Sequence, residues 1–379
     1  MAHERDAVEL TKSLLRFETI NPTGDETACA RHLGDVLADA GFRVDYHPYG
    51  ERRTCVVASV GGNTAKAPLC ITGHIDTVPL GGTRWRKDPF AGEVDGERLY
   101  GRGSSDMKSG VAAFVVAALA FRGRLAGTPG LTLVITGGEE TGCEGAFHLA
   151  RTQGALGNAG AILVAEPTAN YPLVGHKGAF WLEARTHGVT AHGSMPERGD
   201  NAVYKAARAA LAIEQFDFAT PAHPLLGRPT LNVGTLHGGL NINSVPDLAR
   251  IGIDIRTVPG QDHAALLDRL SAHLGSDVEL ETLLDVGGVH TDARDAWVAD
   301  VFDVMAPILG EAPVARGVSY FTDAAALRPA YGNPPTVILG PGEPQMAHQT
   351  DEYCNAGRIR EAVDAYAEIV RRWCFASPP

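Results

Sequence analysis

The sequence predicts an α/β protein with a mainly parallel sheet and a second, inserted α+β domain. Short apolar runs, TCVVASV, APLCITG, LTLVITG, AGAILVAE and PTVILG, alternate with longer Ala-rich stretches, which is typical of parallel strands joined by helices. Within residues 178–285 the expected order changes to strand, helix, strand, strand, helix, as in a compact α+β unit. We therefore expect a first domain in two segments, residues 1–177 and 286–379, interrupted by a second domain over residues 178–285.

The spacing of apolar side chains predicts the helices. Residues 4–17 repeat apolar side chains at helical spacing, and the turn NPTG at residues 21–24 ends this segment before a second helix. Further helices are expected over residues 202–213, 262–274 and 296–309.

The composition excludes several classes of protein. The 379 residues include 45 acidic and 33 basic side chains, a formal net charge of −12, which argues against an electrostatic nucleic-acid binder. The longest apolar run, residues 111–121, has eleven residues, whereas a membrane-spanning helix needs about 20, so a buried helix and no membrane span are predicted. The six cysteines form no CxxC pair and the N-terminal residues lack the pattern of a secretory signal, so we expect free thiols in a cytoplasmic protein.

Polar residues gather where the strand-like runs stop, and in open α/β sheets ligands bind beyond the carboxyl ends of the strands. Asp106, in GRGSSDMKSG, opens an apolar helix, where an N-cap is its alternative role. The other candidates follow strand-like runs or lie on the loop behind the last run, and they are His74, Asp76, Glu139, Glu140, Glu166 and His348. Each alone has an ordinary structural explanation, but together they indicate one site.

Carboxylates and imidazoles are the ligands that divalent zinc, cobalt and manganese bind in proteins. Two metal ions that share one carboxylate are a common hydrolytic arrangement, and five ligands suit two ions. Without metal, several carboxylates so close together would repel one another. The sequence therefore predicts a centre of two divalent metal ions, zinc first, with cobalt and manganese as alternatives.

The strings GHIDTVP, GRGSSDMKSG, GGEETG, AEPT and HQTDEY, in that order, resemble the metal-site signature of the di-zinc aminoacylase family, and the similarity runs from Asn21 to Tyr353. This family includes acetylornithine deacetylases, succinyl-diaminopimelate desuccinylases, aminoacylases and carboxypeptidases of the glutamate type. The strings LNVGTLHGG, DIRTVPG and AHQTDEY are most similar to those of acetylornithine deacetylases. The resemblance implies a metallo-exopeptidase-like catalytic domain, with the insert serving as the lid or dimerisation domain of a homodimer.

The resemblance also implies a role for each candidate residue. One metal ion would be held by His74, Asp106 and Glu166. The other would be held by Asp106, Glu140 and His348. Asp76 would accept a hydrogen bond from the His74 ring and fix its orientation. Glu139 would be the general base that takes a proton from a metal-activated water and returns it to the leaving nitrogen.

Three residues of the insert receive a role from the same resemblance. His192, in GVTAHGSMP, would donate to the oxyanion and reach an active site, often that of the other subunit. Arg256 would bind the substrate carboxylate with its guanidinium group, and Asn243 would help to hold substrate or oxyanion. A strand-end histidine and a surface salt bridge are the alternatives for His192 and Arg256. Phe321 stands where relatives carry a glycine, which affects the shape of the substrate pocket.

The implied function is the removal of an acyl group from a small N-acyl amino acid, with N-acetylornithine as the first candidate and hence a role in arginine biosynthesis. The alternatives within the family are a succinyl-diaminopimelate desuccinylase, another N-acyl or N-formyl amidohydrolase, and a dipeptidase or carboxypeptidase. A non-catalytic binding protein on the same fold is the alternative from another class. The retention of all five ligands and of Glu139 argues against it.

Overall fold

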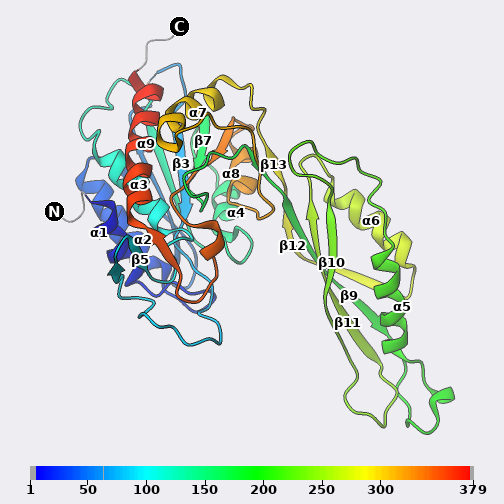
Figure 1. The fold of residues 1–379 in the computed structure, drawn as a ribbon. Coiled ribbons are helices and arrows are strands. Elements are labelled where there is room, and N and C mark those ends of the chain that lie inside the picture. The colour runs from blue at the N-terminus through cyan, green and yellow to red at the C-terminus, as the bar shows by residue number, and fades with distance from the viewer. Residues whose placement is uncertain (1–5, 63, 376–379) are drawn as a thin grey trace. The chain divides into compact units, whose positions relative to one another are not determined.

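The computed structural model describes residues 6–62 and 64–375, which divide into two compact units (Figure 1). Unit 1 comprises the described residues of Met1–Gly175, His290–Arg316 and Thr322–Pro379, and unit 2 comprises His176–Val289 and Gly317–Phe321. Unit 2 thus begins two residues before and ends four residues after the range 178–285 expected from the sequence. It also includes Gly317–Phe321, which the sequence analysis assigned to the first domain.

Unit 1 is built on a six-stranded mixed sheet in the order β1-β2-β6-β3-β7-β14. Its strands are β1 (Arg43–Gly50), β2 (Arg53–Val60), β3 (Leu69–His74), β6 (Leu131–Thr136), β7 (Ala161–Val164) and β14 (Thr336–Ile338). Strands β6, β3, β7 and β14 run parallel to one another, whereas β2 pairs antiparallel with both β1 and β6. The mainly parallel α/β class is confirmed, with an antiparallel hairpin at one edge that the sequence analysis did not anticipate.

Helices cover this sheet (Figure 1). They are α1 (Ala7–Leu15), α2 (Glu26–Asp39), α3 (Lys108–Leu119), α4 (Glu144–Arg151), α7 (Ala296–Leu309), α8 (Ala324–Ala330) and α9 (Ala356–Phe375). All residues of α3 from Lys108 to Ala118 are buried, and the helix packs against α1, α9 and β3. The apolar run at residues 111–121 is therefore a core helix, as expected. Residues 4 and 5 of the helix expected over 4–17 lie outside the described residues.

A smaller three-stranded sheet of unit 1 lies beside the loops that follow β3 and β14. It has the order β15-β5-β4, with β4 (Val94–Asp95), β5 (Arg98–Tyr100) and β15 (Tyr353–Asn355). Strands β5 and β15 pair antiparallel, with Tyr100 opposite Tyr353. This pairing brings the segment that begins at Arg102 next to the segment that ends at Glu352.

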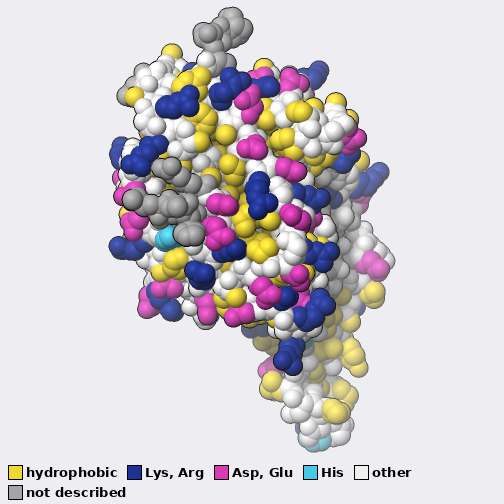
Figure 2. Space-filling model, turned by 60° about the vertical axis from the view of Figure 1, so that its left-hand side comes forward, with side chains coloured by type: hydrophobic (Ala, Val, Ile, Leu, Met, Phe, Trp, Pro, Cys, Tyr) yellow, Lys and Arg dark blue, Asp and Glu magenta, His cyan; other side chains and the backbone are white. Residues whose placement is uncertain are grey.

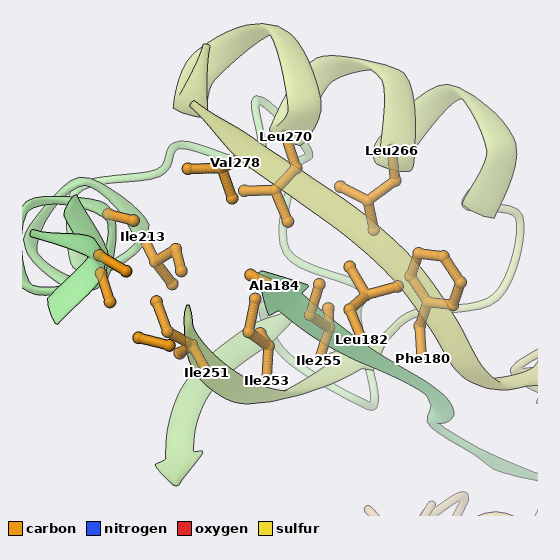
Figure 3. Packing of buried hydrophobic residues seen from close by; sticks show 14 residues of the cluster. Phe180, Leu182, Ala184, Ile213, Ile251, Ile253, Ile255, Leu266, Leu270 and Val278 are labelled. Atoms are coloured by element: carbon orange, nitrogen blue, oxygen red, sulfur yellow. The ribbon is translucent and has the colours of Figure 1, made fainter. Parts of the chain in front are cut away.

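Unit 2 is a four-stranded antiparallel sheet in the order β10-β11-β9-β12, packed against two helices. Its strands are β9 (Gly178–His187), β10 (Thr230–Gly238), β11 (Leu248–Thr257) and β12 (Val278–Val286), and its helices are α5 (Ala202–Glu214) and α6 (His263–Leu274). Alternate residues of β9 and β11, such as Leu182 and Ile253, point towards Leu266 and Leu270 of α6 (Figure 3). The expected order is present, and β12 adds a fourth strand that the sequence analysis missed.

Short segments complete the chain: strands β8 (Gly175–His176) and β13 (Val289–His290), and the 3₁₀ turns Pro196–Arg198 and Pro344–Met346. The six cysteines are free and buried, as expected. On the face that Figure 2 shows, Lys and Arg side chains are interspersed with Asp and Glu rather than gathered into a basic patch. Of the helices in the described part of the chain, none has the length and apolar run needed to cross a bilayer.

Candidate metal centre

Three neighbouring parallel strands of unit 1 end next to the site. Strand β3 ends at His74, β6 ends three residues before Glu139, and β7 ends two residues before Glu166. Because the carboxyl ends of parallel strands meet at one edge of a sheet, these side chains converge. His348 lies on the loop that follows β14, the next strand of the same sheet.

Asp106 lies between two imidazoles. Its Oδ1 atom is 3.3 Å from Nε2 of His74, and its Oδ2 atom is 3.4 Å from Nε2 of His348. The cap of α3 is Met107, which makes no side-chain capping bond, so the N-cap alternative for Asp106 is wrong. A carboxylate that faces a different imidazole with each oxygen has the geometry of a ligand shared by two metal ions.

The other candidate ligands complete two groups around His74. Ligand atoms of His74, Asp106 and Glu140 lie within 4.8 Å of one another, as do those of His74, Glu139 and Glu166. His348 Nε2 is 3.0 Å from Oε2 of Glu140, and His74 Nε2 is 3.8 Å from Oε1 of Glu166. All five residues expected to bind metal are therefore brought together, and Glu139 lies among them, with its Oε2 atom 4.0 Å from His74 Nε2.

The donor set fits a divalent cation. His74 Nε2 and Asp106 Oδ1 are buried and have no hydrogen-bond partner among the described residues, which is costly for polar atoms unless a further group binds them. The ring of His74 donates from Nδ1 to the backbone oxygen of Asp76 at 3.0 Å, so the lone pair of Nε2 points into the cluster. Carboxylate oxygens and imidazole nitrogens suit zinc, cobalt or manganese.

The charges of the cluster are strongly coupled. Burial raises the pKa of Glu139 and of Glu166, and neighbouring carboxylates raise both further. Burial and the charge of Asp106 raise the pKa of Glu140 to about 7. Hydrogen bonds to Asp106 and Glu140 raise the pKa of His348 to about 10. Without a cation, protons would have to neutralise these carboxylates, and a divalent ion would replace those protons.

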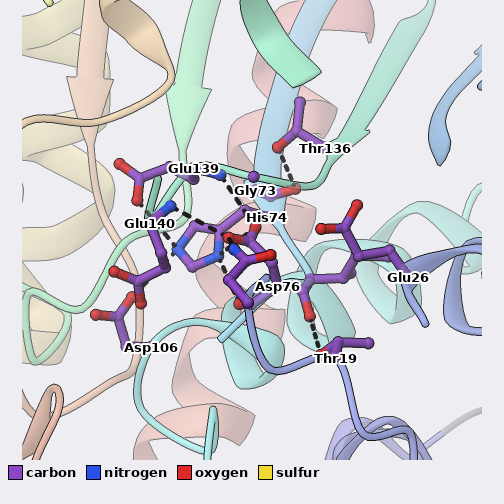
Figure 4. A network of polar contacts seen from close by, with 12 residues as sticks. Thr19, Glu26, Gly73, His74, Asp76, Asp106, Thr136, Glu139 and Glu140 are labelled. Atoms are coloured by element: carbon purple, nitrogen blue, oxygen red, sulfur yellow. Dashed lines mark hydrogen bonds and ion pairs between the residues drawn. The ribbon is translucent and has the colours of Figure 1, made fainter. Parts of the chain in front are cut away.

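Asp76 joins His74 to the loop that carries both glutamates (Figure 4). Its side chain is fully buried, with Oδ1 3.4 Å from Nδ1 of His74. The backbone N–H groups of Glu139 and Glu140 donate to its two oxygens, both at 3.1 Å. Asp76 thus orients His74 mainly through its backbone oxygen, and its carboxylate fixes the Glu139–Glu140 loop.

Several residues that support the site escaped the sequence analysis. Asn21, assigned only to a turn, donates from Nδ2 to Asp76 Oδ2 at 2.5 Å, and Arg53 donates to Asn21 Oδ1 at 3.4 Å. Asp323, two residues after Phe321, was expected near the site from the family resemblance, but its contacts were not. It accepts a hydrogen bond from the hydroxyl of Thr136, at the end of β6, and its burial raises its pKa to about 6. Glu352 lies in the string HQTDEY, but a single sequence does not reveal that it is buried.

His192, Asn243 and Arg256 all lie in unit 2. His192 is exposed, with Nδ1 2.8 Å from Oγ of Ser194, and the backbone N–H of Gly193 donates to the oxygen of Asn243 at 2.7 Å. The loops of His192 and Asn243 are therefore adjacent. Arg256 forms an ion pair with Asp254, with Nε 3.0 Å from Oδ1, which is the salt bridge that the sequence analysis gave as its alternative role.

Asn243 and Arg256 lie near opposite ends of β11. Strand β11 begins at Leu248, five residues after Asn243, and ends at Thr257. Eight residues of extended strand separate Leu248 from Arg256, a span of about 26 Å. Within one copy of unit 2, Arg256 is therefore too far from the His192–Asn243 loops to contact the same small substrate.

In unit 1, the ends of parallel strands present imidazoles and carboxylates around a shared aspartate. This arrangement is that of the two-metal hydrolases. The chain belongs to peptidase family M20/M25/M40, whose model matches residues 70–372, and the expected resemblance is confirmed. It is accordingly an enzyme that hydrolyses amide bonds.

Relatives and solved structures agree with this family. The chain is 29% identical to an acetylornithine deacetylase from Proteus mirabilis, over 97% of each chain. It is 27% identical to a probable succinyl-diaminopimelate desuccinylase from Staphylococcus aureus, over 97% of this chain and 98% of the relative. An M20 family metallo-carboxypeptidase from Sulfolobus solfataricus has the same fold, with a TM-score of 0.80 at 19% identity over 97% of this chain and 99% of that chain.

Proposed function

We propose that this enzyme removes the acyl group from a small N-acyl amino acid, and that N-acetylornithine is the first substrate to test. The observation that carries the proposal is Asp106, whose two oxygens face His74 and His348. Relatives named acetylornithine deacetylase and succinyl-diaminopimelate desuccinylase are similar to the chain to nearly the same degree. N-succinyl-diaminopimelate is therefore the second candidate, since the bond that is cleaved is the same and only the acyl group and side chain differ.

The centre would hold two divalent ions, with zinc favoured by its mixed imidazole and carboxylate ligands. One ion would bind to His74, Asp106 and Glu166, and the other to Asp106, Glu140 and His348. The short distances from His74 to Asp106 and Glu166, and from His348 to Asp106 and Glu140, support this division. When bound, two such ions polarise the scissile carbonyl and lower the pKa of water.

Glu139 is the proposed general base. Its carboxyl lies beside His74, and burial together with Glu166 raises its pKa above the ordinary range of a glutamate. A carboxylate with a raised pKa accepts a proton from water more readily and, once protonated, can donate it to the leaving nitrogen. Asp76 keeps Glu139 in place through the backbone N–H of that residue.

His192 is the proposed donor to the oxyanion, and we propose that it acts in a homodimer. Two exposed apolar side chains lie just before Asn243, Leu240 at 95% and Ile242 at 104% relative exposure. Apolar side chains so exposed are typical of contact surfaces. The distance of Arg256 from the His192 loop also favours a site to which two copies contribute, one supplying Arg256 to the substrate carboxylate and the other supplying His192.

We place the enzyme in the cytoplasm. Its six cysteines are free and buried, which suits a reducing compartment.

Glu139→Gln tests the proposed function, with Glu311→Gln, on an exposed loop, as the matched control. We expect the variant to retain both metal ions and to lose at least ~100-fold in kcat on a panel of N-acetyl, N-succinyl and N-formyl amino acids. Loss of the metal ions would show instead that Glu139 is a ligand. Fully loaded wild-type protein that binds a panel member but cleaves none would favour a binding protein.

A further inference from the structure

The side chain of Glu352 lies behind the metal centre, is fully buried and uses both of its oxygens. Its Oε1 atom accepts hydrogen bonds from the backbone N–H groups of Ser105 and Asp106, at 2.8 and 3.0 Å. Its Oε2 atom accepts one from the backbone N–H of Gly103 at 2.9 Å and one from the guanidinium of Arg102 at 2.6 Å. Four donors of the segment that ends at Asp106 therefore converge on one carboxylate.

Arg102 extends this contact to the loop of His348. Its Nη1 atom also donates to the backbone oxygen of Gln349 at 3.3 Å, the residue directly after His348. Its Nη2 atom donates to Pro79 at 3.1 Å, and its guanidinium lies 5.1 Å from the ring centre of Trp85. The buried pair of Arg102 and Glu352 thus connects two ligand-bearing loops that lie more than 200 residues apart in the sequence.

The loop of His348 needs such support because its backbone is in an uncommon conformation. His348 and Asp351 have φ values of 64° and 57°, a left-handed region that costs free energy for residues other than glycine. Asp351 is fixed by Arg86, whose backbone N–H and Nε donate to it at 2.7 and 2.6 Å. Contacts on both sides of the turn therefore determine where the His348 imidazole lies.

We propose that Glu352, through its pair with Arg102, is a positioning residue that places the Asp106 carboxylate and the His348 imidazole together. This inference rests on the proposed two-metal centre. Both oxygens of Glu352 are bonded to Arg102 and to backbone N–H groups, so it would act through the backbone of Asp106 and through Arg102 rather than on substrate or metal. A neutral amide in its place would set an NH₂ group against N–H donors, since only an ionised carboxylate accepts from both oxygens.

The two ions should respond differently to the loss of this carboxylate. The ion bound by Asp106, Glu140 and His348 would lose the placement of two of its ligands. The ion bound by His74, Asp106 and Glu166 would lose only one, because β3 and β7 place His74 and Glu166 independently. Changes to residues that orient metal ligands typically weaken metal affinity 10–100-fold.

Titration of metal-free full-length protein with Co²⁺, followed by visible absorption and calorimetry, tests this inference through Glu352→Gln. We expect the affinity of one of the two Co²⁺ steps to fall 10–100-fold and that of the other to change much less. Excess Co²⁺ should restore kcat with KM for the substrate unchanged. Glu343→Gln is the matched control, because Glu343 is also buried and pairs with an arginine, Arg358. Its carboxylate bonds to Arg358 and Gln345, and only its backbone N–H, which the substitution keeps, bonds to Ser105.

Arg102→Lys is a second variant that keeps the buried charge pair but lacks the guanidinium arms that reach Gln349 and Pro79. It should weaken the same Co²⁺ step by a smaller factor. Unchanged Co²⁺ affinities in folded Glu352→Gln, or an equal loss at both steps, would overturn the inference. The readout is metal affinity, so it stays distinct from the proposed function, which fails if loaded wild-type protein hydrolyses no N-acyl amino acid.

Discussion

Loading the metal-free enzyme with divalent ions at pH 7 should release protons. Metal ligands must be deprotonated to bind, and the cluster holds protons when no cation neutralises it. The pKa of His348 is raised to about 10, so this imidazole is almost fully protonated at pH 7. The pKa of Glu140 is raised to about 7, so it is about half protonated. Burial lowers the pKa of His74, but Asp76 and the other carboxylates around it outweigh that effect and raise it.

The expected magnitude follows from these groups. His348 and Glu140 together release about 1.5 protons at pH 7. The raised pKa values of His74 and Glu166 act in the same direction and add to this number. Binding should therefore strengthen as the pH rises from 6 to 8. Since each released proton contributes about tenfold per pH unit, a release of about 1.5 protons means that the product of the two affinities should rise at least about 30-fold per unit near pH 7.

Calorimetric titration in buffers of different ionisation enthalpy measures the number of protons directly. His348→Ala should release about one proton fewer. His187→Ala is the matched control, because this exposed histidine of unit 2 forms an ion pair with a surface carboxylate, that of Glu279. A release of less than one proton from wild-type protein, or an affinity that does not vary between pH 6 and 8, would refute this reasoning about the charges of the cluster.

Three further outcomes are expected. Asn21→Ala removes a hydrogen bond to Asp76 and should weaken Co²⁺ binding about 10-fold without unfolding the protein, as measured by titration and circular dichroism. Ile242→Asp should convert the proposed dimer to monomers in light scattering and lower kcat. Burial raises the pKa of Glu26 from 4.5 to about 7, so its contribution to stability is present below pH 4.5 and is lost as the pH rises towards 7. In urea unfolding, this loss lowers the free energy of unfolding of wild-type protein by at most about 3 kcal/mol between pH 5 and 7.5. Glu26→Gln should not show this decrease.

The sequence was sufficient to predict the residues at the strand ends. A buried parallel strand is a nearly continuous apolar run, so the first polar residues after it, such as His74 and Glu139, mark the edge where ligands bind. Asp106 was recognised as a ligand only through the resemblance of GRGSSDMKSG to the metal-site signature of the family, because its place before an apolar helix alone favours an N-cap. The order of the strands in the sheet depends on pairing over long sequence distances. A single sequence does not reveal this order.

Residues that act through burial and long-range contact were not predictable. Glu352 and Arg102 are ordinary charged residues in the sequence, and their importance arises only when the pairing of β5 with β15 buries them together. Strand β12 was missed because its exposed side carries glutamates, as the sequence VELETLLDV shows. The distance between Arg256 and Asn243 depends on the length of β11 and so appeared only in the structure.

Metal content and turnover of Asp106→Ala test most directly the central claim that Asp106 joins two ions in a hydrolytic centre. Wild-type protein should bind two divalent ions per chain and hydrolyse a member of the N-acyl amino-acid panel, with activity lost on chelation and restored by metal. Asp106→Ala should bind at most one ion and show no measurable hydrolysis. A variant that still binds two ions and turns over substrate at the wild-type rate would contradict the account.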